Sequence, residues 1–254
     1  MTTYKVKIWL SEKLINYSYS TWNEPYRAAK VAETYLEKAF HNHADSADVS
    51  YSTTGIPVPQ EGCGGFDGTE ICNDDDNYWN TLFDWWRNYA RADCTDLTLV
   101  RDTNLLITNH YECSWGWGDG HWATACCGKA LLSANPDNYK KFGSQCEDEA
   151  IDAVQEEVAH SLHWNNSNPD KDGDGEVPHD YGTVKYKDNK GYITPVGQVG
   201  EGEEAFDAPG VNYNNCDEYA DKSDTDWDGN DNADGWAHWY SDCSIDYFTM
   251  NPGP

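Results

Sequence analysis

The chain has 254 residues, with 45 Asp and Glu against 17 Lys and Arg, and a formal net charge of -28. Such a charge, without any basic stripe, excludes a nucleic acid partner, because a phosphate backbone would be repelled. Its 12 Trp and 17 Tyr exclude a disordered acidic chain, and the lack of a run of about 18 apolar residues excludes membrane insertion.

The acidic charge favours a high-salt environment, because molar salt shortens the Debye length to about 3 Å and relieves self-repulsion. Nine cysteines are spread along the chain without Cys-x-x-Cys spacing, which favours disulfides over a cysteine zinc module. Candidate local pairs are Cys63 with Cys72 and Cys216 with Cys243, and one cysteine is left over. We therefore expect an extracellular or virion-surface protein of a halophilic archaeon or its virus.

The first part of the chain predicts strands and amphipathic helices in turn. Alternating apolar residues predict strands over 1–10 and 47–52, and short runs bounded by turn residues predict strands over 97–100 and 104–111. Apolar residues at helical spacing predict helices over 24–40 and 76–91, the second rich in aromatic residues.

A segment rich in Trp and Gly follows over 114–125, with large and small residues alternating. Glycines in a strand allow another backbone to approach closely, so we expect an edge strand that binds substrate. The candidate substrate-binding residues are Trp117, Gly118, His121 and Trp122. A helix is then predicted over 147–164.

This helix carries the sequence Glu156-Glu157-Val158-Ala159-His160. Zinc peptidases use His-Glu-x-x-His, in which two histidines one turn apart bind zinc and the glutamate is the general base. Glu157 and His160 match the base and the second histidine, whereas Glu156 stands in place of the first. Either Glu156 replaces that histidine as a ligand, or it abolishes the site.

Residues 1–165, with an edge strand followed by the motif helix, resemble the upper subdomain of a metzincin zinc peptidase. The resemblance implies an α+β fold: a twisted mixed sheet with backing helices and an active-site helix, followed by a loop-rich lower subdomain over 166–254. It implies zinc bound by Glu156, His160 and His179, with Glu157 as catalytic base. Two features depart from the family: the short spacing to the third histidine is absent, and Val196 stands where the turn below the metal normally has methionine.

Two Asp-rich stretches in 166–254 predict structural calcium loops, because carboxylates at alternate positions before a glycine turn can wrap a calcium ion. Neither has the glutamate that ends an EF-hand loop. We expect calcium and disulfides to stabilise this part of the chain. The candidate calcium ligands are Asp170, Asp172, Asp174 and Asp180 in the first loop and Asp224, Asp226, Asp228, Asp231 and Asp234 in the second.

Two functions follow from these patterns. The first is a zinc endopeptidase, weakened or inactive because of Glu156, that binds an extended peptide along the edge strand. The alternative is a catalytically silent metzincin-fold module that binds a cell-surface protein and serves structure or adhesion on a halophilic virion or cell surface.

Overall fold

A computed structural model describes residues 1–40, 43–62, 81–110, 116–163, 184–187, 190–195, 235–240 and 242–248. The elements up to the motif helix are β1 (Thr3–Ser11), α1 (Glu12–Trp22), α2 (Arg27–Lys38), β2 (Ser46–Ile56), α3 (Leu82–Arg91), β3 (Thr103–Ile107), β4 (Gly116–Asp119), β5 (Trp122–Ala125), α4 (Gly128–Leu131), β6 (Phe142–Gly143) and α5 (Cys146–Leu162). They are followed by β7 (Val184–Lys187), β8 (Lys190–Ile193), β9 (Gly235–Ala237) and α6 (Asp242–Tyr247).

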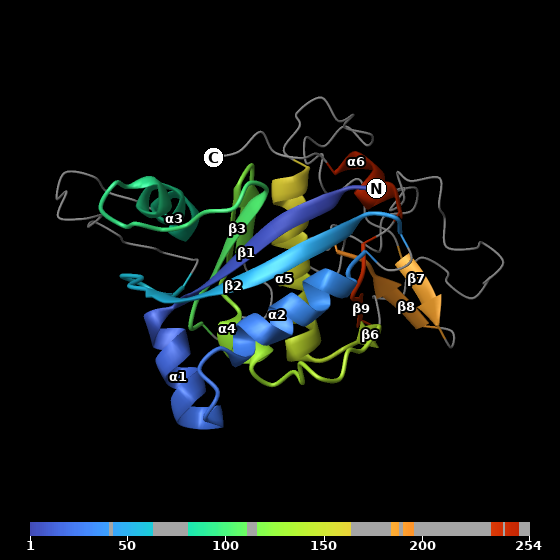
Figure 1. Ribbon diagram of the computed structural model, residues 1–254. Helices are drawn as coiled ribbons and strands as arrows, with labels where there is room; N and C mark the ends of the chain where they lie inside the picture. Colours follow the sequence, from blue (N-terminus) through green and yellow to red (C-terminus); the bar gives the residue numbers. More distant parts are fainter. Residues whose placement is uncertain are drawn as a thin grey trace.

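The central sheet has five strands in the order β2-β1-β3-β5-β4. β1 pairs in parallel with β2 and β3, and β3 pairs in parallel with β5. β4 alone is antiparallel, paired with β5, and forms one edge of the sheet. The chain passes from β1 to β2 through α1 and α2, as a parallel pair requires. Figure 1 shows this sheet with α5 beside it.

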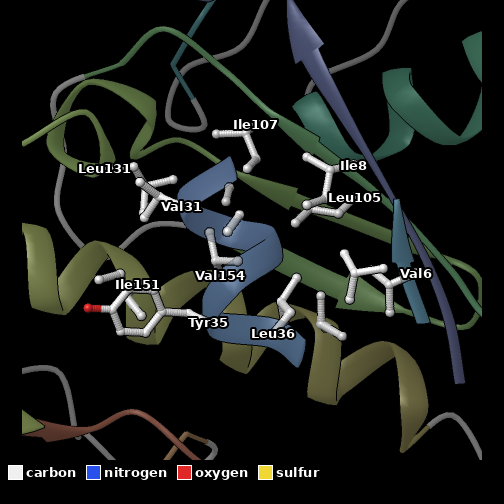
Figure 2. Packing of buried hydrophobic residues seen from close by; sticks show 14 of the residues in the cluster. Val6, Ile8, Val31, Tyr35, Leu36, Leu105, Ile107, Leu131, Ile151 and Val154 are labelled. Carbon is white, nitrogen blue, oxygen red and sulfur yellow. The ribbon is translucent and has the colours of Figure 1, made fainter. Parts of the chain in front are cut away.

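The sheet is covered on both faces, because apolar residues of its strands alternate between two cores. Val6, Ile8 and Leu105 pack with residues of α2 and α5 in the larger core, as Figure 2 shows. Trp9 and Leu106, one residue out of phase, pack with α3 in the smaller core. Figure 1 shows α3 on the other side of the sheet from α2. The period of two in β1 and β3 therefore produces both layers.

The C-terminal part of the chain packs against the first part. β6, β9, β8 and β7 form a second, four-stranded sheet in that order. The Tyr240 backbone N–H donates to the Ala39 carbonyl at 2.7 Å, and the Tyr4 hydroxyl donates to the Phe248 carbonyl at 3.2 Å. The segment that follows β9 thus packs against α2 and β1.

The expected mixed sheet backed by helices is confirmed, and it is mostly parallel. The expected strand over 97–100 is wrong, since this segment is irregular. The Asn104 side chain accepts from the Val100 N–H at 3.0 Å and donates to the Val100 carbonyl at 2.9 Å. These bonds occupy the backbone N–H and C=O groups of Val100, which would otherwise pair with a neighbouring strand. The subdomain boundary at 165/166 stays a prediction.

Helix α1 was not expected from the sequence. Its N-cap is Ser11, whose side chain accepts from the Leu14 N–H, and its C-cap is Asn23 at a φ of 54°. Both are residue types that favour these positions. The predicted helix over 76–91 begins at Leu82 in the structure, with Thr81 as N-cap, and residues 76–80 lie outside the described part. Among the described helices, none has the length and apolar character needed to cross a membrane.

Candidate functional site

Helix α5, which carries the motif, runs from Cys146 to Leu162, close to the predicted 147–164. Gln145 and Asp148 form a capping box at its start, and the first turn is acidic, which complements the positive end of the helix dipole. His163 is the C-cap. Its ring contacts Ser244 Oγ at 3.1 Å through Nε2 and stacks edge-on against Phe248. His163 therefore packs at the end of the helix.

The edge strand β4 lies directly against α5 at the motif. A Cβ atom added to Gly118 would lie 2.0 Å from the backbone oxygen of Glu157 and 2.9 Å from Cβ of His160. A Cβ added to Gly116 would lie 2.4 Å from Cγ of Glu157. Only glycine permits this approach. The two glycines therefore bring β4, the edge strand of the sheet within the described residues, to the turn of α5 that holds Glu157 and His160.

Glu156 and His160 lie together on one face of α5. The distance from Glu156 Oε1 to His160 Nε2 is 3.7 Å, and the two side chains are 23% and 15% exposed. Two ligands of one tetrahedral zinc ion, each about 2.0–2.2 Å from it, lie about 3.4 Å apart. The carboxylate and the imidazole are therefore close enough to share an ion, and solvent reaches both.

Glu157, the next residue on α5, is buried beside β4. Burial raises the pKa of the Glu157 carboxyl well above its usual range, and the negative charge of Glu156 raises this pKa further. A carboxylate with a raised pKa is a stronger base once it is ionised. Glu157 thus has the environment expected of a proton acceptor.

Asp152, one turn before Glu156 on α5, is a buried carboxyl that the motif does not include. It is 4% exposed, and its Oδ1 accepts no hydrogen bond from the described part of the chain. Burial raises the pKa of Asp152 well above its usual range, and Glu156 and Glu149 raise it further. A group whose pKa is higher in the folded state stabilises the fold at low pH, and this contribution is lost as the pH rises through the folded-state pKa.

We therefore expect Asp152→Asn to raise the melting temperature of the EDTA-treated chain at pH 8 by about 2–4 °C, which corresponds to about 1 kcal/mol. The amide keeps the shape and removes the buried charge. The gain should disappear towards pH 4, where the wild-type carboxyl is protonated. Thermal unfolding at the two pH values measures this, with the exposed Asp137→Asn as control. An unchanged or lower melting temperature at pH 8 would contradict the burial of an uncompensated charge.

A second buried side of α5 is anchored by polar contacts. Asp148 Oδ1 lies 3.3 Å from His238 Nε2, and both side chains are buried. The Gln155 amide donates to the carbonyls of Tyr35 and His238, each at 3.1 Å, and the Tyr240 hydroxyl donates to the Gln155 carbonyl at 2.8 Å. These bonds fix the rotation of α5 about its axis, and with it the direction of the motif residues.

The Asp148–His238 pair contributes most to the stability of the fold at pH values above the acid range. Burial raises the pKa of Asp148, but the hydrogen bond from His238 and the backbone N–H of the N-cap residue outweigh burial and leave this pKa below its usual value. Burial lowers the pKa of His238, against the opposing charge of Asp148. Both pKa values are depressed in the folded state, so the pair's contribution to stability is lost as the pH falls through them.

The predicted substrate-binding residues lie on a hairpin and not on one edge strand. Residues 116–119 and 122–125 are the antiparallel strands β4 and β5, so the expectation of a single strand is wrong. Gly120, at a φ of +59°, begins the two-residue loop, as a type II′ turn requires. On the edge strand Trp117 is 62% exposed, whereas Trp122 is 1% exposed and packs in the smaller core. His121 Nδ1 contacts the Arg101 carbonyl at 2.8 Å.

Some predicted site residues lie outside the described part of the chain. Among the described residues, no group of three His, Cys, Asp or Glu side chains is placed to hold a metal ion. A third metal-binding side chain beside Glu156 and His160 is therefore not found among the described residues. The residues outside the described part are His179, Val196 and all the predicted calcium ligands, which are Asp170, Asp172, Asp174, Asp180, Asp224, Asp226, Asp228, Asp231 and Asp234.

The described part of the chain holds both disulfide-bonded and free cysteines. Cys94, Cys126 and Cys146 take part in disulfides. Cys127 is a free, buried thiol whose Sγ lies 3.5 Å from the Ala150 carbonyl, and burial, followed by the charge of Glu157, raises its pKa. The predicted local pairs include Cys63, Cys72 and Cys216, which lie outside the described residues, so these pairings stay predictions.

Sequence reasoning missed the roles of Gly116, Asp148 and Asp152. The glycine spacing was visible, but its partner on α5 depends on the tertiary fold. Comparison of the chain with protein-family models, with curated proteins and with solved structures gives no match.

Proposed function

We propose that the chain is a metzincin-like zinc endopeptidase domain that works in a high-salt, extracellular or virion-surface setting. One observation carries the proposal: β4, the edge strand of the sheet in the part of the chain that the structure describes, lies against the turn of α5 that holds Glu157 and His160. An extended peptide that adds to this edge brings its backbone beside a buried base and a metal-binding pair.

Glu156 and His160 hold the zinc ion from α5, and their 3.7 Å separation supports this assignment. His179, expected as the third ligand from the sequence, completes the set. Two nitrogens and one carboxylate form a ligand set that other zinc peptidases use. When bound, zinc supplies Lewis-acid activation of water and of the scissile carbonyl.

The chain's own residues position the substrate and move the proton. Main-chain groups of β4 bind the extended peptide by strand addition. The carboxylate of Glu157 accepts the proton of the attacking water and delivers it to the leaving amine. Its burial beside β4 keeps bulk water from competing for that proton.

Glu156 weakens the site relative to a three-histidine centre. Its negative charge offsets part of the metal's charge, so the ion is a weaker Lewis acid. Slow hydrolysis is therefore part of the proposal.

Zinc content in molar salt tests the metal assignment. We expect about one zinc per chain after dialysis, and its loss in His160→Ala, because the imidazole supplies a ligand that alanine cannot replace. His43→Ala, a histidine beyond the end of α2 that accepts from the Asp45 N–H, is the matched control and should retain zinc. Equal zinc in both variants would contradict ligation by His160.

The second candidate function is a catalytically silent module that binds a cell-surface protein. Glu156 at the first ligand position favours it. Absence of zinc together with absence of casein cleavage in molar salt would select this function. In either case we propose that the two Asp-rich loops in 166–254 bind calcium and, with disulfides, stabilise that part of the chain.

A further inference from the structure

We infer that β4 selects peptides through two side chains, Trp117 and Asp119, and that the preferred substrate carries a large apolar residue and, two positions away, a lysine or arginine. This inference rests on the proposed function, since it takes β4 to be the edge that binds substrate. It adds a substrate class, an apolar-basic extended peptide, which the zinc motif does not specify.

The sequence of β4 is Gly-Trp-Gly-Asp, so this edge presents only two side chains. Successive residues of a strand face opposite sides of the sheet. Gly116 and Gly118 face α5, where no side chain fits. Trp117 and Asp119 consequently face the α3 side, together with Thr124 and Trp122, their partners on β5. Both Trp117 and Asp119 are exposed.

The α3 side gives Trp117 a fixed aromatic neighbour. Its ring centroid lies 6.3 Å from that of Phe83, which is buried in the first turn of α3. The Arg87 guanidinium lies 5.8 Å from the Phe83 centroid and bonds to Asp84 at 3.1 Å. Even with this neighbour, 62% of Trp117 is exposed. The indole therefore offers apolar area beside the edge at which a peptide backbone would lie.

The hairpin geometry determines which positions an added strand uses. Asp119 and Trp122 close the two-residue loop, so they exchange hydrogen bonds, as do Trp117 and Thr124 two residues earlier. The N–H and C=O groups of Gly116 and Gly118 then point away from β5, to the outer side of the described sheet. Towards an antiparallel peptide, Trp117 and Asp119 occupy non-hydrogen-bonded positions, where facing side chains lie closest.

The negative charge of Asp119 determines which peptide residue is preferred opposite it. Opposite charges on facing strand positions attract and like charges repel, so Asp119 favours lysine or arginine over glutamate. The net charge of -28 acts in the same direction. Aromatic or branched residues facing Trp117 gain from packing on the indole. Because Trp117 and Asp119 are two residues apart, their partners on the peptide are also two apart.

Peptide binding to the full chain tests this inference at a fixed salt concentration. Three blocked peptides differ only at the two positions, with the residue that faces Asp119 first because the peptide runs antiparallel to β4: Lys-x-Phe, Glu-x-Phe and Lys-x-Gly. We expect Lys-x-Phe to bind about fivefold more tightly than either of the others. Trp117→Ala should remove the preference for Phe over Gly, and Asp119→Lys should reverse the preference for Lys over Glu.

Matched variants separate these effects from general ones. Tyr19→Ala removes a comparably exposed aromatic side chain from α1, and Glu37→Lys makes the same charge change on an exposed position of α2. Both should keep the wild-type preferences. Equal affinities for the three peptides, no binding of any, or preferences that survive in Trp117→Ala and Asp119→Lys would overturn the inference. A chain that shows the preferences but neither holds zinc nor cleaves peptides would overturn the proposed function alone.

Discussion

Replacing Glu157 with glutamine is expected to lower kcat/KM for peptide hydrolysis by about 10²–10⁴-fold, the usual contribution of a general base. The amide has the same shape as the carboxyl but does not accept the proton of the attacking water. Because Glu157 is buried with a raised pKa, the neutral amide should also leave the fold at least as stable as before.

Two further measurements make this expectation specific. Zinc content should be unchanged in Glu157→Gln, since the proposed ligands remain. Glu149→Gln, a half-buried glutamate on the same helix, is the matched control and should retain wild-type activity. Activity within twofold of wild type in Glu157→Gln would remove Glu157 from the mechanism.

The second large effect is expected from Gly118→Ala. The new Cβ would lie 2.0 Å from the backbone oxygen of Glu157 and 2.9 Å from its carbonyl carbon. Backbone atoms inside a helix do not move aside, so β4 must separate from α5. We expect the free energy of unfolding to fall by about 1–3 kcal/mol, as in overpacked cores, and peptide cleavage to fall with it.

Urea unfolding compares this variant with Gly55→Ala. At Gly55 the nearest atom to the new Cβ is Cγ of Glu12, at 2.8 Å, part of a flexible side chain that can rotate away. The destabilisation should therefore be clearly smaller at Gly55 than at Gly118. Wild-type stability in Gly118→Ala would show that β4 does not lie against α5 as described.

Much of the fold could be predicted where local patterns determine it. Alternation identified β1, and the apolar spacing of α5 placed that helix within one or two residues of its ends. α1 was missed because its buried surface is small, with only Leu14 and Ser18 buried, so it has no long apolar stripe. The cap residues Ser11 and Asn23 were the available signal.

Prediction failed where distant parts of the chain decide the structure. The segment over 97–100 has strand-type residues, but Asn104 binds its backbone. The Trp and Gly spacing suggested an edge strand, whereas the turn at Gly120 divides that segment into two strands. Trp122, expected to contact substrate, is a core residue because β5 is an inner strand.

The candidate site was predictable only along the helix. The spacing of Glu156 and His160 places them on one face by helical geometry alone. The close packing of Gly116 and Gly118 against Glu157 and His160 depends on the strand order. The burial of Asp152 likewise depends on neighbours that are distant in sequence. These tertiary contacts turn a partial motif into a candidate centre with a binding edge.

The most direct test of the central claim is anomalous X-ray scattering at the zinc absorption edge, from crystals grown in molar salt with zinc. We expect a single strong peak about 2.0–2.1 Å from Nε2 of His160 and within coordination distance of a Glu156 carboxylate oxygen. A peak elsewhere, or none at His160 with zinc in excess, would contradict the claim that α5 presents a catalytic metal to the edge of the sheet.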